Sequence, residues 1–284
     1  MIRGVLNSEV IDHYTKHNIS PDRLKLYSPQ DPDLHLLPGE RISPLVEPCT
    51  ALFCHYAMTK SQVLKRHFLF QSRPPLGREM SVDSLGKSRT CFNNWSKTYS
   101  CTPELYFEPE TTEEIKQILC YASEKGKKVK TVGCGHSFSN LACTTDFMIS
   151  MARYNRVLKI DKEKLQVTVQ GGCLIKDLNE VILPENGMAF STQGTVSSLT
   201  AAGVISTGTH GSGANFSNIS ASVVDLELML SSGEIIKVSN TENAELLPVV
   251  SLSLGSVGVI LSITFQCERA FNLHWKQYPD TLGN

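Results

Sequence analysis

The turn TVGCGHSFSN, Thr131–Asn140, carries the residues of this sequence that are best suited to chemistry. Gly133 and Gly135 allow the backbone to approach a ligand closely and to adopt positive φ without a steric penalty. Successive N–H groups in such a turn form a concavity that binds phosphate or pyrophosphate. Ser137 adds a hydroxyl donor, and His136 stands where its imidazole can reach the rest of the bound molecule.

A second glycine-rich segment, GTHGSG at Gly208–Gly213, lies further along the chain. Two such loops indicate a ligand with a long diphosphate body, such as a dinucleotide. The common nucleotide motifs do not match, because Phe138 occupies the place of the third glycine in a Rossmann fingerprint. The sequence GxxxxGK[ST] is also absent, which excludes a P-loop.

Composition removes several other classes of function. A net charge of -1 and a pI near 6.7 give no electrostatic reason to expect a nucleic-acid partner. Nine cysteines without CxxC spacing favour free thiols in a reducing compartment, and without HExxH no metal site is expected. Met1–Ser20 has no apolar core of the kind found in a signal peptide.

The first part of the chain, residues 1–90, is rich in proline and lacks sustained periodicity, so we expect an extension of low order. One helix could lie in Ala51–Phe70, and an incorrectly predicted first exon is an alternative origin for this region. Regular structure is expected to begin near Cys91.

A β-α-β unit is predicted next. Leu105–Phe107 and Val129–Val132 are typical of strands, and Thr111 with Glu114 forms a capping box that starts the helix between them. Gly126 is expected at the helix C-cap. Apolar residues at helical spacing should face a core: Ile115, Ile118, Leu119 and Ala122. The last strand leads into the glycine turn, and Phe147–Met151 forms a further strand, which completes a small lobe of about residues 99–155.

The remaining segment, about residues 156–272, is expected to form a larger lobe with an antiparallel sheet and inserted helices. Strands are predicted at 157–160, 165–169, 225–230 and 235–238, with a short helix at 174–183 closed by Pro184 and Gly187. Leu246–Cys267 is uncharged for 22 residues, which is a membrane-spanning length. Its glycines and its period-two alternation favour a helix, a glycine turn and a strand with one solvent-exposed face.

Five blocks in this order resemble a known family: WSKTYSCTPELYFEP, KKVKTVGCGHSFSNLACTTDFMISM, NRVLKIDKEKLQVTVQGG, GVISTGTHGSG and LGSVGVILSITFQC. From about Asn94 to Leu282 the chain resembles the FAD-binding domains of the vanillyl-alcohol oxidase/p-cresol methylhydroxylase (PCMH) class, and within it the L-gulonolactone (aldonolactone) oxidases. The resemblance implies an α+β, PCMH-type FAD-binding domain of two lobes over residues 91–272. Residues 273–284 would begin a linker to a C-terminal substrate domain that the sequence does not show.

The resemblance also implies the site residues, and it implies FAD as cofactor. His136 would be the point of covalent attachment to the flavin, although some members of the class bind FAD without that bond. The expected cofactor-binding residues are Gly133, Cys134, Gly135, His136, Ser137, Phe138, Gly194, Thr195, Ser198, Gly203, Ser206, Gly208, Thr209, His210, Gly211, Gly258, Val259 and Ile260. For His210 the alternative is a loop histidine that orders its own turn.

The activity that the resemblance implies is oxidation of an aldono-1,4-lactone at C2, with dioxygen as acceptor and hydrogen peroxide and an ascorbate-type product. Catalytic residues are expected in the substrate domain and none is assigned here. The alternatives are an alditol or sterol oxidoreductase of the same class and a catalytically silent FAD-binding fragment. The family also implies association with the endoplasmic reticulum membrane; otherwise a cytoplasmic location is expected.

Overall fold

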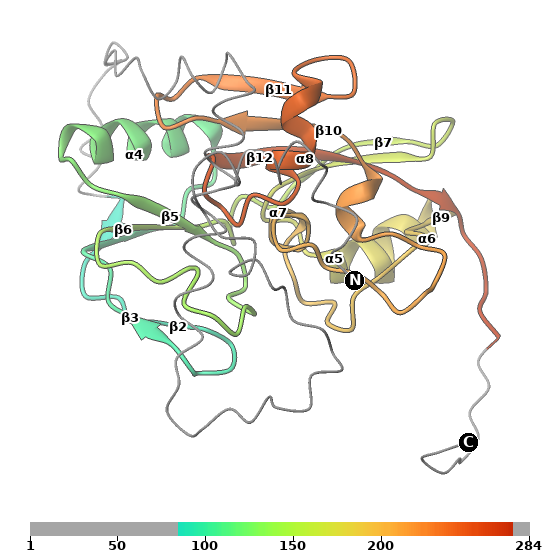
Figure 1. Ribbon diagram of the computed structural model, residues 1–284, viewed down its shortest axis with the longest axis horizontal. Coiled ribbons are helices and arrows are strands. Elements are labelled where there is room, and N and C mark those ends of the chain that lie inside the picture. The colour runs from blue at the N-terminus through green and yellow to red at the C-terminus, as the bar shows by residue number, and fades with distance from the viewer. Residues whose placement is uncertain (1–84, 275–284) are drawn as a thin grey trace, which may run out of the picture. The chain divides into compact units, whose positions relative to one another are not determined.

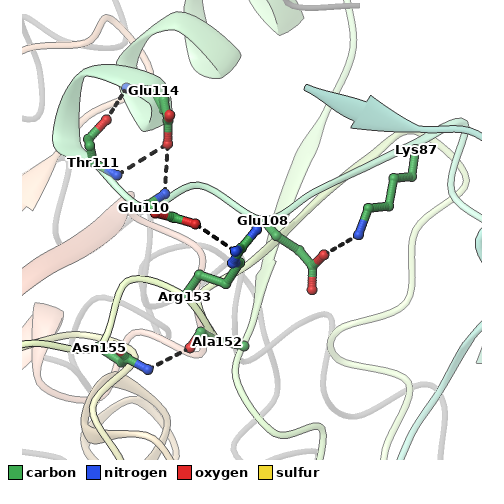
Figure 2. A network of polar contacts seen from close by, with 8 residues as sticks. All are labelled: Lys87, Glu108, Glu110, Thr111, Glu114, Ala152, Arg153 and Asn155. Atoms are coloured by element: carbon green, nitrogen blue, oxygen red, sulfur yellow. Dashed lines mark hydrogen bonds and ion pairs between the residues drawn. The ribbon is translucent and has the colours of Figure 1, made fainter. Parts of the chain in front are cut away.

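The computed structural model describes residues 85–274, which form a mixed α+β fold with two main sheets and few helices (Figure 1). The predicted helix at Ala51–Phe70 and most of the predicted extension lie outside these residues. Regular structure starts before Cys91, because β1 (Gly86–Lys87) pairs antiparallel with the strand at Leu105–Phe107. Lys87 also forms an ion pair with Glu108 (Figure 2).

The smaller main sheet has the strand order β1-β4-β6-β5. Its further strands are β4 (Leu105–Phe107), β5 (Val129–Val132) and β6 (Phe147–Ser150). These three strands were predicted from the sequence, and they run parallel. The strands of the expected β-α-β unit are not neighbours, because β6 inserts between β4 and β5. The turn that leaves β5 leads directly to the candidate site.

Helix α4 (Thr112–Glu124) begins at the predicted capping box. The Glu114 amide donates to Oγ1 of Thr111 at 3.2 Å, and the Thr111 amide donates back to Oε2 of Glu114 at 3.2 Å (Figure 2). Both bonds satisfy amide donors that a helix N-terminus leaves unpaired. Nearby, Arg153 forms an ion pair with Glu110 at 2.8 Å, which connects the helix start to the segment after β6 (Figure 2).

The helix ends one residue earlier than predicted. Lys125 is the C-cap, and Gly126 follows it in the left-handed region with φ 63°. The Lys127 amide reaches the carbonyl of Ala122 at 2.8 Å, and the Gly126 amide reaches that of Ser123 at 3.2 Å. This Schellman arrangement favours glycine after the C-cap rather than at it.

Helix α4 packs into a core that it shares with both main sheets. The four helix residues predicted to be buried are buried: Ile115, Ile118, Leu119 and Ala122. They cluster with Phe107, Phe147 and Ile149 of the smaller sheet and with Met229, Val259 and Leu261 of the larger one. We call this cluster the α4 core. It joins the two sheets through continuous apolar packing.

The larger sheet is antiparallel throughout and has the order β11-β10-β12-β8-β7. Its strands are β7 (Val157–Asp161), β8 (Gln166–Gln170), β10 (Val223–Met229), β11 (Ile235–Ser239) and β12 (Val259–Gln266). The predicted hairpins β7–β8 and β10–β11 are confirmed. A second cluster, which we call the sheet core, packs on this sheet and includes Val167, Leu226, Ile263 and Phe265.

Strand β12 is confirmed, but of its predicted solvent-exposed face, Ser262, Thr264 and Gln266, only Gln266 is exposed. Ser262 and Thr264 are 5% and 6% exposed. Ser262 Oγ donates to Glu227 Oε2 at 2.8 Å, and Thr264 Oγ1 donates to Asp225 Oδ1 at 3.1 Å. These two hydroxyls can therefore be buried, because carboxylates on the neighbouring strand β10 accept their hydrogen bonds.

A register shift in β12 explains why simple alternation fails. Glu227 pairs with Ser262, whereas Leu228 pairs with Ile260, so that Leu261 is left out of the ladder. An extra residue of this kind reverses which side chains face each side of a sheet. Leu261 consequently joins the α4 core, while Ile260 joins the sheet core.

The predicted helix at 174–183 is a composite that runs two residues further. It consists of α5 (Ile175–Asp177), the π-helix η3 (Leu178–Ile182) and α6 (Leu183–Glu185). Pro184 does not end the helix, because α6 continues to Glu185 after it. Gly187 follows with φ 70°.

The remaining elements are short. They are β2 (Phe92–Asn93) paired with β3 (Ser100–Cys101), β9 (Met188–Ala189) paired with β13 (Glu268–Arg269), α7 (Ala201–Ser206), η4 (Ile219–Ser222), η5 (Ala244–Leu246) and α8 (Leu247–Val250). The uncharged run after Leu246 is a helix, a glycine turn and strand β12, as predicted. Within residues 85–274, no helix has both the length and the apolar character needed to cross a membrane.

Candidate functional site

A cavity of about 300 Å³ lies among the turn after β5, helix α7 and the start of β12. It brings together three segments that the sequence analysis singled out separately. Eleven of the predicted site residues line it: Gly133, Cys134, Gly135, His136, Ser137, Gly203, Ser206, Thr209, Gly258, Val259 and Ile260.

The other predicted residues are not among those that line the cavity: Phe138, Gly194, Thr195, Ser198, Gly208, His210 and Gly211. Phe138 is 71% exposed. Two of the glycines allow neighbouring loops to touch instead. A Cβ at Gly194 would come within 2.5 Å of Thr209 Cγ2, and one at Gly211 within 2.7 Å of Thr192 Oγ1. These positions need glycine for loop packing.

His210 is exposed, and its Nδ1 lies 2.9 Å from the carbonyl oxygen of the adjacent Gly211. This contact agrees with the alternative considered for His210, in which the ring orders its own turn. The two histidines of the two glycine-rich segments therefore have different surroundings.

The turn after β5 packs directly on the start of helix α7. A Cβ at Gly133 would lie only 2.2 Å from Oγ1 of Thr200. Thr200 is the N-cap of α7, and the same Oγ1 accepts a hydrogen bond from the Gly203 amide at 3.3 Å. Gly135 has φ 67°, a conformation that favours glycine. Two glycines thus fix the shape of the turn for different reasons.

His136 lies partly buried in the cavity wall, and burial lowers the pKa of its imidazole. The neutral ring, which keeps a nitrogen lone pair, is therefore favoured near pH 7. Trp95 stacks on it, with ring centroids 5.2 Å apart and an interplanar angle of 26°. The Trp95 amide also donates to the carbonyl of Gly135 at 2.8 Å. Trp95 thus holds the turn through both backbone and ring.

Several lining residues were missed by the sequence analysis. Asn94 is 4% exposed, and its Nδ2 donates to the carbonyl of Ser137 at 2.9 Å. Thr200 was also missed, because its role depends on a contact with a segment far away in the sequence. Lys130 could have been found, since strand alternation places it on the same side as Val132, which leads into the turn.

The charges around the cavity suit an anionic ligand. Among the described residues that line it there is no aspartate or glutamate, and Lys130 is the one lysine or arginine. Lys130 forms no ion pair with another of the described residues. A lysine without a carboxylate partner, beside a glycine turn, fits a phosphate or diphosphate.

Comparison with known proteins identifies this class of site. Residues 103–239 match a family described as an FAD binding domain. The chain is 47% identical over 191 residues to L-gulonolactone oxidase of Scyliorhinus torazame and 46% identical over 191 residues to that of Bos taurus. It is 36% identical over 210 residues to D-arabinono-1,4-lactone oxidase of Debaryomyces hansenii.

Residues 103–239 therefore form an FAD-binding domain, and about two thirds of the chain is similar to these L-gulonolactone and D-arabinono-1,4-lactone oxidases. The alignments to the first two relatives cover 67% of the chain and 43% of each relative, and the third covers 69% and 38%. The chain thus spans less than half the length of the curated relatives that it matches.

Proposed function

We propose that the cavity binds FAD and that the protein is an aldonolactone oxidase. The proposed reaction oxidises the C2 hydroxyl of a substrate such as L-gulono-1,4-lactone, with dioxygen as acceptor and hydrogen peroxide as a product. The observation that carries this proposal is the meeting of the glycine turn, helix α7 and the start of β12 around a cavity whose lining, within residues 85–274, includes no acidic side chain. The names of the relatives supply the substrate class.

The residues of the cavity fit the parts of FAD. The backbone amides of Gly133–Ser137 would donate to the diphosphate, and Lys130 would offset its negative charge. A Cβ at Gly203 would come within 2.8 Å of Thr200 Oγ1, so a side chain at this position of the cavity wall would clash with the N-cap residue of α7. When bound, FAD would supply hydride acceptance and reaction with dioxygen.

We also propose that His136 carries the flavin covalently through its 8α-methyl carbon. Two observations support this role: His136 lines the cavity, and burial lowers the pKa of its imidazole. Only the neutral ring has a free nitrogen lone pair for bond formation. Stacking on Trp95 would restrict the imidazole to a narrow range of orientations.

A two-lobe arrangement, with a boundary near residue 155 and FAD between the lobes, is the finer structural proposal. Its support is that both main sheets contribute to the cavity. Lys130 and Val132 belong to β5 of the smaller sheet, and Val259 and Ile260 belong to β12 of the larger one. Membrane association, which the family resemblance implies, remains a further proposal.

The test uses the full chain, purified and incubated with FAD. We expect a yellow protein whose flavin stays with the chain after acid precipitation, and hydrogen peroxide formation with L-gulono-1,4-lactone. Alditol and sterol substrates, assayed in parallel, test the alternative reactions. A colourless protein that takes up no FAD would refute the cofactor assignment. Bound FAD without lactone oxidation would refute the oxidase activity of this chain and leave the cofactor assignment intact.

A further inference from the structure

Two cysteines that are far apart in the sequence meet beside the cavity. Cys101 lies in β3, and Cys143 lies in the loop between β5 and β6. The amide of Thr144 donates to Sγ of Cys101 at 3.4 Å. This bond places Cys101 Sγ beside the backbone that follows Cys143. Burial and the neighbouring Cys101 together raise the pKa of Cys143 to about 11.

Each cysteine is attached to a wall of the cavity. Cys101 is the register partner of Phe92, a lining residue of the β2–β3 hairpin. Leu141 and Ala142, immediately before Cys143, line the cavity from the other side. Among the described strands, β2 and β3 pair only with each other. A bond between the two sulfurs would therefore fasten the hairpin to the loop that follows the glycine turn.

We propose that Cys101 and Cys143 form a reversible disulfide, with a small-molecule disulfide as the oxidant. Cys101 is the attacking sulfur, because the raised pKa of Cys143 keeps that thiol protonated. Its attack forms a mixed disulfide and releases one thiolate of the oxidant. Cys143 then loses its proton to solvent and attacks Cys101 Sγ, which releases the second thiolate. Two cysteine thiols are oxidised, and the oxidant is reduced to two thiols.

Three of the other described cysteines provide internal controls. Cys91 is exposed, whereas Cys173 and Cys267 are buried. Cys173 and Cys267 are shielded from a dissolved oxidant by the surrounding core, and burial also raises the pKa of Cys173 to about 11 and that of Cys267 to about 12. Exposed single thiols should form mixed disulfides with the oxidant, and buried ones should stay reduced. Intramolecular bond formation at Cys101 and Cys143 is distinct from both behaviours.

The experiment equilibrates the full chain in buffers of reduced and oxidised glutathione. Free thiols are then alkylated, and non-reduced peptides are mapped by mass spectrometry. We expect a peptide that joins Cys101 to Cys143, which accumulates as the buffer becomes more oxidising and disappears after reduction. Alkylation of both residues in the most oxidising buffer, while Cys91 carries glutathione, would overturn the proposal. A bond from Cys101 to a different cysteine would overturn it as well.

A thermal measurement tests the mechanical consequence. Closing this loop with a disulfide should raise the unfolding temperature of the oxidised chain by on the order of 5–10 °C relative to the reduced chain. Cys143→Ser should abolish the difference, and the matched control Cys91→Ser should keep it. Equal unfolding temperatures in the oxidised and reduced chains would show that the bond does not fasten the two walls. Should Cys143→Ser fail to fold, the peptide map of the unaltered chain decides alone.

Discussion

Two glycine-rich segments of this chain each contain a histidine, yet they occupy different environments. The segment after β5 lines the cavity from Gly133 to Ser137 and directs His136 into its wall. In the segment at Gly208–Gly213, none of the glycines lines the cavity, and the exposed His210 contacts its own turn. The comparison teaches that a glycine-rich motif marks close backbone contact, and that the partner of this contact can be a ligand or another loop.

Separate replacement of His136 and of His210 should give the largest difference, which is a difference in covalent flavin content. His136→Ala should remove all flavin that survives acid precipitation, because the imidazole nitrogen is lost. His210→Ala should leave covalent flavin unchanged. The measurement is flavin absorbance of the denatured, precipitated chain. Equal loss in both variants would break the comparison between the two segments.

Replacing one glycine of each segment with alanine should distinguish an effect on FAD affinity from an effect on folding stability. Gly133→Ala puts a Cβ 2.2 Å from Thr200 Oγ1, and overpacking of this kind costs about 1–3 kcal/mol. Because the strain falls on the cavity wall, we expect FAD affinity to fall by roughly tenfold or more. Gly211→Ala strains a contact with Thr192, and neither of these residues lines the cavity.

Gly211→Ala should therefore lower the unfolding temperature while FAD affinity stays the same. Fluorescence titration with FAD and thermal unfolding of both variants provide the two readouts. Loss of FAD affinity in Gly211→Ala, at a temperature where the chain is folded, would contradict the division between the segments.

Two lysines of one region test the charge of the cavity. Lys130→Gln should weaken FAD binding about tenfold, as expected for one charge-assisted hydrogen bond to phosphate. Lys128→Gln is the matched control, because Lys128 is exposed and does not line the cavity. Titrations at low and high salt should show a steeper salt dependence in the unaltered chain than in Lys130→Gln. Equal affinities in the two variants would remove Lys130 from the site.

The smallest expected effect is the pH dependence of covalent flavin attachment at His136. Burial lowers the pKa of His136, so the folded chain favours the neutral ring and the unfolded chain binds a proton more readily. The contribution of this group to stability is therefore present above the unfolded pKa of about 6.5 and lost as pH falls below it. The initial rate of covalent flavin attachment should reach half its maximum below pH 6.5, about the ordinary histidine value. A midpoint above that value would contradict the burial of the imidazole.

The fold was predictable where the determinants are local. The capping box at Thr111 and Glu114 and the hairpin of β10 and β11 depend on residues that are close in the sequence. The position of β6 between β4 and β5 was not predictable in this way, because strand order depends on contacts between distant segments.

The same distinction applies to the site. The turn at Gly133–Ser137 was predicted in place, since its glycines and histidine are consecutive. For Gly194 and Gly211, the sequence motifs alone could not show that these glycines face other loops. Thr200 was missed for the same reason, because only the folded chain brings its hydroxyl against Gly133.

The register shift that leaves Leu261 out of the β10–β12 ladder has a consequence for unfolding. Leu261 is embedded on one side of that strand and Ile260 on the other, each in a different apolar cluster. If either main sheet unfolded alone, apolar side chains of the α4 core or the sheet core would become exposed to water on the part that stays folded. Heat or denaturant should accordingly melt residues 85–274 in a single cooperative transition, with no stage at which one sheet survives alone.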